Sequence, residues 1–326
     1  MAAKVDQYKD KTCLDPQMAK ILERQNTLGQ SYPDLNCLTA DEIRSLYADE
    51  RRFWNEDAPV LQKICDIQIE GLVRPIPLRI YYPDQPNGSN PIFFLHGGGW
   101  LVGNPDTHDK ITRLMAINSG YPVVSIDYAL APRHKFPIAI TETLMVVEHM
   151  LYHGANYSLS TQRIGLAGDS AGANMSAACG LLLGEKYPSL VAKLGLFYGG
   201  FGLHDSPSRR LYGSKEDGLT QDDLLYYQQC YLKDSSDRHD PRYCVLNANL
   251  DSFPPAFIAA ASLDPLCDDS VALSAKLNNC GIIHELVIYP GVLHGFLHMS
   301  RMLDKAHEAI TSASQTFTEA FSRNPN

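Results

Sequence analysis

The feature that most restricts the fold of this chain is an alternation of short strand-like runs with helical segments from about residue 60 onward. β-Branched and aromatic residues dominate the short runs, as in strands of a βαβ protein. The later runs are continuously apolar, as in strands covered on both faces, so they predict a mostly parallel sheet with helices on both sides. The expected strands lie at residues 66–70, 78–82, 92–95, 123–126, 163–167, 193–197, 256–261 and 283–288.

The first two expected strands lie close together, with a polar connector between them, and could form an antiparallel pair at one edge of the sheet. Helices are expected at residues 138–151, 171–183 and 301–321. A further helix is expected to open at Asp268 and Asp269, whose carboxylates favour a helix N-terminus, and to close near Gly281.

Two segments do not follow the alternation. The first 55 residues contain a helix, since Thr39 and Glu42 form a capping-box pattern. Residues 200–250 interrupt the strand series, and Thr220 and Asp223 are expected to cap a helix there. An insert after a strand stands over the carboxyl edge of such a sheet. We therefore predict a single domain over residues 1–326, with a cap formed by about 1–55 and about 200–250; peripheral decoration is the alternative.

Composition excludes several classes of function. The net charge of −9 argues against binding to nucleic acid or to an anionic membrane, because both need clustered Lys and Arg. None of the eight cysteines forms a CxxC pair, so a zinc site has no support. No apolar run approaches the length of about 20 residues that spans a bilayer. Residues 1–11 lack the apolar core of a secretory signal, and a cytoplasmic setting is expected.

The sequence GDSAG at residues 168–172 lies between an expected strand and an expected helix. A serine on such a tight turn projects from the top of the sheet, and glycines two residues away on either side leave room for the crowded backbone. The new helix directs its N–H groups toward developing negative charge. The pentapeptide alone is a weak signal. Its context nevertheless favours Ser170 as a nucleophile over a purely structural turn.

The sequence HGGGW at residues 96–100 directly follows the expected strand 92–95. Consecutive glycines lose much backbone entropy on folding, which is tolerated where the backbone must approach a ligand or another segment. A loop of this kind supplies oxyanion donors in lipases and esterases. We assign the donors to the N–H groups of Gly97, Gly98 and Ala171. His96 is expected to hold the loop by hydrogen bonds rather than to act as a base.

The general base is expected after residue 170, because the chain order of this type of triad is serine, acid, histidine. His294 lies in the loop directly after the last expected strand, where catalytic residues gather. His298 lies closer to the final helix and is the alternative. The other histidines after the serine fall in the insert, a strand or the final helix: His204, His239, His284 and His307.

The acid of a triad is expected on the loop after the preceding strand, which offers Asp264, Asp268 and Asp269. Asp264 comes first after the apolar run, and Pro265 stiffens the turn beyond it. We predict Asp264 as the acid. Asp268 and Asp269 are better explained as helix-capping carboxylates.

Together these motifs resemble the hormone-sensitive-lipase family of α/β-hydrolases. HGGGW, YALAPR at residues 128–133, GDSAG, DPL at 264–266 and HGF at 294–296 occur in that family's order, over nearly the whole chain. Within the family the chain is most similar to bacterial acetyl esterases, with further matches at residues 51–59, 106–109 and 209–213. Ala173 replaces a third glycine found in many members, and Trp100 replaces a Phe.

The resemblance implies an α/β-hydrolase fold with an eight-stranded sheet and a helical cap. It implies hydrolysis of short-chain acyl esters without a cofactor or a metal. Carried over residue by residue, it gives Ser170, Asp264 and His294 as the triad and His96, Gly97 and Gly98 as the oxyanion segment. It also raises regulatory protein partners as a second role.

The predicted chemistry is nucleophilic attack by Ser170 on a small ester, followed by hydrolysis of an acyl-enzyme. A non-enzymatic regulator or ligand-binding protein on a hydrolase scaffold is the competing interpretation, although such proteins usually lose a triad member. Amidase or carbamate hydrolysis by the same triad is the third. A homodimer is a further expectation.

Overall fold

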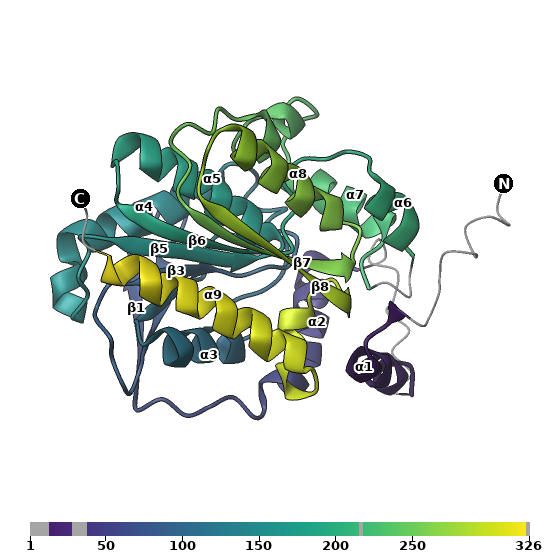
Figure 1. Cartoon of the computed structure of the whole chain (residues 1–326), viewed down its shortest axis with the longest axis horizontal. Coiled ribbons are helices and arrows are strands. Elements are labelled where there is room, and N and C mark those ends of the chain that lie inside the picture. The colour runs from purple at the N-terminus through teal and green to yellow at the C-terminus, as the bar shows by residue number, and fades with distance from the viewer. Residues whose placement is uncertain (1–12, 28–37, 215–217, 324–326) are drawn as a thin grey trace, which may run out of the picture.

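An eight-stranded sheet lies at the centre of the computed structural model, which describes residues 13–27, 38–214 and 218–323 (Figure 1). The strand order is β1-β2-β4-β3-β5-β6-β7-β8. Each strand overlaps one of the eight that the sequence predicts. Their bounds are Lys63–Ile69, Ile76–Tyr82, Ile92–Leu95, Val123–Ile126, Ile164–Asp169, Val191–Phe197, Ala256–Leu263 and His284–Leu293, for β1 to β8.

The sheet is antiparallel at one edge and parallel through the rest. β1 pairs with β2, and β2 with β4, in antiparallel register. All the other neighbours, from β4 through β3 to β8, pair in parallel. The expected antiparallel edge pair is therefore confirmed. The carboxyl ends of the parallel strands meet at one rim of the sheet, where α/β folds place their sites.

Helices cover both faces of the sheet (Figure 1). The helices α4 (Ile138–His153), α5 (Ala171–Lys186) and α8 (Cys267–Asn279) share one apolar core with the sheet, and α3 (Asp109–Ser119) and α9 (Asp304–Ser322) share the other. Strand β3 supplies Phe93 and Leu95 to the first core and Ile92 and Phe94 to the second, as alternating strand side chains must.

Small residues set how closely the helices approach the sheet. A Cβ atom on Gly165 or Gly195 would crowd the ring of Phe317. The aromatic ring of α9 therefore packs directly on the backbone of β5 and β6. On the other face, α5 is rich in Ala and Gly and is almost completely buried.

The helices α1 (Pro16–Thr27), α2 (Ala40–Asn55), α6 (Pro207–Tyr212) and α7 (Gln221–Tyr231) lie beyond the end of the sheet at which β7 and β8 finish (Figure 1). Both predicted capping boxes are present, Thr39 with Glu42 and Thr220 with Asp223. From α2, the Arg44 side chain donates to the carbonyl oxygens of Leu101 at 3.0 Å and Ala131 at 2.8 Å.

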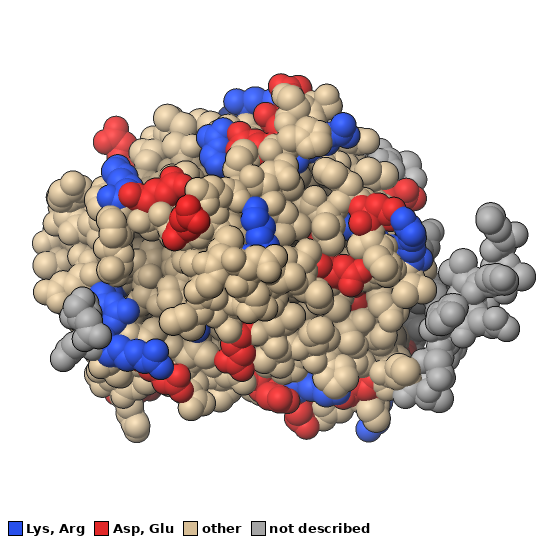
Figure 2. All heavy atoms as spheres, turned by 45° about the horizontal axis from the view of Figure 1, so that its top comes forward, with Lys and Arg blue, Asp and Glu red and all other residues tan. Residues whose placement is uncertain are grey.

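Parts of the expected cap fall on residues 1–12, 28–37 and 215–217, outside the described residues. Across the described part of the face shown in Figure 2, acidic and basic side chains are interspersed rather than gathered into a basic area. None of the helices in residues 13–27, 38–214 and 218–323 combines the length and apolar character needed to cross a membrane. Within the same residues, seven cysteines are described and all are free thiols.

Candidate active site

Ser170 lies on the turn between β5 and α5, in a backbone conformation that few residues adopt. Its φ of 53° and ψ of −118° are strained for a residue with a side chain. The turn also needs small neighbours, because a Cβ atom on Gly172 would overlap the carbonyl oxygen of Leu95, and one on Gly168 would overlap the Gly172 backbone. The Ser170 N–H donates to the Phe197 carbonyl at 2.8 Å. These contacts fix the hydroxyl at the carboxyl end of β5.

His294 lies between Ser170 and Asp264. Its Nε2 atom is 2.9 Å from the Ser170 Oγ atom, and its Nδ1 atom is 2.8 Å from the Asp264 Oδ2 atom. Asp264 is fully buried, and its Oδ1 atom accepts the Leu266 N–H at 2.8 Å. The three residues follow three different parallel strands, so the topology alone brings together positions far apart in the sequence. The geometry is that of a Ser-His-Asp triad.

The other histidines after Ser170 have different neighbours. His298 lies against Asp169, 4.0 Å from its Oδ2 atom, and 3.5 Å from the Tyr47 hydroxyl. His284 shares a hydrogen bond of 2.8 Å with Ser274, and His307 is exposed on α9. The remaining two stack edge to face with each other in the insert: His204 and His239.

Asp268 and Asp269 lie in the first turn of α8, as predicted, but the prediction that they cap this helix is wrong. The residue at the N-cap position is Leu266, and no side chain makes a capping bond. Asp268 accepts the Ser208 N–H at 2.8 Å. The Asp269 side chain is fully buried, pairs with Arg209 at 3.0 Å and accepts three backbone N–H groups from the insert: Phe201, Gly202 and Leu203. Both carboxylates therefore attach the insert to the sheet domain.

The loop after β3 approaches the serine turn through Gly97. The Gly97 N–H donates to the Asp169 Oδ1 atom at 2.8 Å. The assignment of this N–H as an oxyanion donor is therefore wrong, because its hydrogen already has an acceptor. Gly98 and Gly99 adopt φ values of +113° and +58°. Among the described residues, no acceptor pairs with the N–H groups of Gly98, Gly99 or Ala171.

His96 holds this loop, as the sequence predicts. Its Nδ1 atom lies 2.9 Å from the Gly97 carbonyl oxygen, and its ring stacks on Tyr128 at 4.2 Å between centroids. The Tyr128 hydroxyl donates to the His96 carbonyl at 2.7 Å. Burial, followed by the neighbouring His108, lowers the pKa of His96 to about 3. The ring is therefore neutral at neutral pH and donates from Nδ1.

Helices from both unusual segments reach this loop. The ring of Tyr227 on α7 lies directly against Gly99, so a Cβ atom there would overlap it. Ile43 and Tyr47 of α2 form a small apolar cluster with Leu101 and Val102 of the same loop. The active-site rim is therefore bounded by α2 on one side and α7 on another.

Comparison with known proteins agrees with this geometry. A family model described as the alpha/beta hydrolase fold matches residues 92–298, a span that includes the serine, the acid and the histidine. The chain belongs to the α/β-hydrolase family. The fold class predicted from the sequence is thus confirmed.

Relatives of this α/β-hydrolase include acetyl esterases and esterases of known structure. An acetyl esterase of Salmonella choleraesuis (strain SC-B67) is 44% identical over 279 residues, 84% of this chain and 85% of that protein. The hyperthermophilic esterase of Pyrobaculum calidifontis is 29% identical, with a TM-score of 0.88 over 94% of this chain and 98% of that one. An ester-hydrolase from the metagenome of Lake Arreo is 27% identical, with a TM-score of 0.89 over 95% and 100%.

The sequence motifs did not identify two residues of this site. Asp169 and His108 are buried next to each other below the serine turn, with the His108 Nε2 atom 3.3 Å from the Asp169 Oδ1 atom. Asp169 is the second residue of GDSAG, and His108 belongs to the segment at residues 106–109 that resembles the acetyl esterases. Their places in these two motifs were the features of the sequence from which both residues could have been found.

Proposed function

We propose that this α/β-hydrolase is a serine carboxylesterase of the acetyl-esterase type, acting on short-chain acyl esters. The observation that carries the proposal is the continuous line of contacts from Asp264 through His294 to Ser170, at 2.8 and 2.9 Å. Identity of 44% with an acetyl esterase over most of the chain supports the class of substrate. In this proposal Ser170 is the nucleophile, His294 the general base and Asp264 the acid.

The first step forms the acyl-enzyme. His294 Nε2 takes the Ser170 hydroxyl proton as Oγ attacks the ester carbonyl carbon. Asp264 accepts the hydrogen bond from Nδ1, keeps the imidazole in the productive tautomer and stabilises the imidazolium. The imidazolium then gives its proton to the leaving alcohol oxygen as the carbon–oxygen bond breaks. Water repeats the sequence on the acyl-enzyme and releases the carboxylic acid.

The negative oxygen of each tetrahedral intermediate needs donors on the far side of the serine. We assign these to the N–H groups of Gly98, Gly99 and Ala171, since that of Gly97 is engaged by Asp169. Ala171 begins α5, so the helix dipole adds to its donor. One such donor contributes about 10²–10³ in rate.

The segments at about 1–55 and 200–250 act as the cap of this proposal. The Tyr227 ring packs against Gly99, and buried Trp100 stacks on Tyr231 at 4.5 Å between ring centroids. Both tyrosines belong to α7, and we expect them to restrict the space beside the loop at residues 96–100, the oxyanion loop. This supports short-chain esters over lipids.

Substitution Ser170→Ala tests the proposal. We expect kcat for p-nitrophenyl acetate to fall by at least about 10⁴-fold, because the attacking oxygen is removed. The matched control is Ser235→Ala at an exposed position, which leaves kcat unchanged. Retained turnover in folded Ser170→Ala would contradict the assignment, and equal rates on matched ester and anilide substrates would favour an amidase.

We also propose a cytoplasmic setting, a homodimer and regulatory protein partners, on the basis of the sequence. Light scattering on the purified chain tests the dimer, and a monomer at micromolar concentration would count against it. The complete triad geometry favours an enzyme over a purely regulatory protein.

A further inference from the structure

Four polar side chains lie buried together beneath the serine turn, and the triad uses none of them. They are His96, His108, Asp169 and His298, each at most 5% exposed. They come from four separate places in the chain: the loop after β3, the N-terminus of α3, the end of β5 and the short 3-10 helix at Phe296–Arg301. Buried polar groups of this kind need partners, so their hydrogen bonds define what the cluster does.

Asp169 joins the serine turn to the loop after β3. Its Oδ1 atom accepts the Gly97 N–H at 2.8 Å, and its Oδ2 atom accepts the Tyr198 hydroxyl at 3.4 Å. Asp169 directly precedes Ser170, and Gly97 directly precedes Gly98. The carboxylate therefore sets the spacing between the nucleophile and the donors assigned to the oxyanion.

His108 is held on both sides of its ring. Its Nδ1 atom lies 2.9 Å from the Thr107 hydroxyl oxygen, which is itself 2.8 Å from the Asn104 carbonyl oxygen. Its Nε2 atom lies 3.3 Å from the Asp169 Oδ1 atom. A hydrogen on Nε2 points toward this carboxylate and leaves Nδ1 to accept the Thr107 hydroxyl.

A metal ion does not fit between these groups. Possible ligand atoms of His108, Asp169 and His298 lie within 4.8 Å of one another. Two atoms bound to one zinc ion at about 2.0–2.1 Å in tetrahedral geometry are about 3.3 Å apart. The His298 Nε2 atom is 4.0 Å from the nearer Asp169 oxygen, which is too far for a shared ion. A hydrogen on His108 Nε2 needs no third ligand.

The surroundings of the cluster keep the Asp169 carboxyl group ionised. Burial raises the pKa of Asp169, but His108 and the Gly97 N–H lower it by more, and it ends below its usual range. Burial lowers the pKa of His298 far below its usual value, and Arg51 and His108 lower it further. The contacts from His108 and Gly97 therefore offset the cost of burying this carboxylate.

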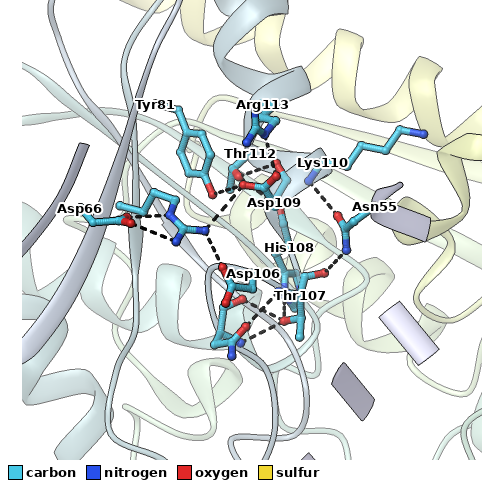
Figure 3. A network of polar contacts seen from close by, with 12 residues as sticks. Asn55, Asp66, Tyr81, Asp106, Thr107, His108, Asp109, Lys110, Thr112 and Arg113 are labelled. Atoms are coloured by element: carbon cyan, nitrogen blue, oxygen red, sulfur yellow. Dashed lines mark hydrogen bonds and ion pairs between the residues drawn. The ribbon is translucent and has the colours of Figure 1, made fainter. Parts of the chain in front are cut away.

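A second network holds His108 from its other side, as Figure 3 shows. Asp109, the first residue of α3, accepts from Tyr81 at 2.8 Å and from Arg113 at 2.6 Å. Arg79 pairs with Asp66 and Asp106 at 2.6 Å each. These contacts attach the segment that carries His108 to β1 and β2.

We propose that His108 and Asp169 form a positioning pair that holds the oxyanion loop in register with Ser170. The inference rests on the proposed esterase function. Neither side chain touches a reacting atom. Both act through the Gly97 contact on the donors that follow it.

Three variants test the pair on p-nitrophenyl acetate: His108→Gln, Asp169→Asn and the double variant. We expect each single change to lower kcat about 10–100-fold with KM within about threefold, because the oxyanion donors are displaced rather than removed. The double variant loses no more than the worse single one, since both act through one contact. His307→Gln, the same change at an exposed position, leaves kcat unchanged.

A second measurement needs no variant to fold. In the ¹⁵N-histidine spectrum of the wild-type protein at pH 7, we expect the Nε2 atom of His108 to carry a hydrogen, with the ring assigned through its contact to the Thr107 methyl group. A bare Nε2 atom on His108, one equivalent of bound divalent metal, or wild-type kcat in His108→Gln would overturn the pair. Failure of the proposed function would show differently, as an inactive wild-type protein or an active Ser170→Ala.

Discussion

At the scale of single residues, Gly97 is where the serine turn and the oxyanion loop meet. Its N–H is bound by Asp169, and any Cβ atom at this position would overlap the Asp169 carboxylate. The glycine is required by this close approach, because its φ is not in the left-handed region. Its neighbours Gly98 and Gly99 are required by their positive φ as well as by close contacts with Val102 and Tyr227.

Substitution Gly97→Ala follows from this contact. The added methyl group must push the loop away from Asp169, so we expect kcat for p-nitrophenyl acetate to fall about 10–100-fold. The control is Gly281→Ala, where φ is +68° and nothing lies within 4 Å of the added atom. That variant loses about 1 kcal/mol in the free energy of unfolding and no activity. Equal activity of the two variants would show that the Gly97 contact does not position the donors.

Motif spacing predicted some residues of the site and not others. Ser170, Asp264 and His294 could be chosen from chain order and from strand ends alone, and the structure brings their side chains into contact. The sequence could not show that the Gly97 N–H is already engaged, because the carboxylate that accepts it, Asp169, lies 72 residues further along the chain. His108 carried no local pattern, and its role depends on contacts that only the folded chain creates.

At the scale of elements, α7 carries the ring nearest to the oxyanion loop. Tyr227 lies on Gly99, between the cap helices and the sheet domain. A helix with a capping box at its start and an anchor at its end holds that ring in place: the Lys135 side chain donates to the carbonyl oxygens of Gln229 and Leu232. The insert thus contacts the oxyanion loop through two aromatic side chains of α7, Tyr227 at Gly99 and Tyr231 at Trp100.

Substitution Tyr227→Ala tests this role of α7. Removing the ring opens space above the loop, so we expect the ratio of kcat/KM for octanoyl to acetyl p-nitrophenyl esters to rise about tenfold or more. Tyr152→Ala serves as the control, because that ring is 78% exposed on α4. An unchanged ratio in Tyr227→Ala would mean that another element limits chain length.

Most elements could be predicted because their signals are local. Short runs rich in β-branched and aromatic residues predicted the eight strands, and two capping boxes predicted α2 and α7. Helix α3 was missed, since it begins at Asp109 and its N-cap residue, His108, makes no side-chain capping bond. The last helix begins at Asp304 rather than residue 301, because a 3-10 turn intervenes at Phe296–Arg301.

At the scale of the whole molecule, neutral histidines buried in the core connect stability to pH. The pKa of His96 is lowered to about 3 and that of His298 far below its usual value, in both cases first by burial. Below about pH 6.5 the unfolded chain binds a proton at each position, while the folded chain does not. The free energy of unfolding must therefore fall as the pH drops through this window.

Asp169 lowers the free energy of unfolding further at lower pH. Its folded pKa is lowered, so its contribution is present above the unfolded value of 3.8 and disappears as the pH falls through the folded pKa. The raised pKa values of three carboxyl groups, two buried and one half-buried, act in the opposite direction: Glu142, Asp269 and Asp127. All these carboxyl groups are common to the wild-type protein and to a histidine variant, so a comparison of the two isolates the histidine effect.

Urea unfolding at pH 7 and at pH 5.5 measures the effect of the two histidines. We expect the wild-type protein to lose about 1 kcal/mol per buried neutral histidine between these pH values, about 2–3 kcal/mol in total. His298→Gln removes one of the two sites and should halve the difference between pH values, even if its stability at pH 7 is lower. His307→Gln, at an exposed position, keeps the full difference. Equal stability of the wild-type protein at both pH values would mean that water or a counterion reaches the cluster and lets both rings take up protons in the folded state.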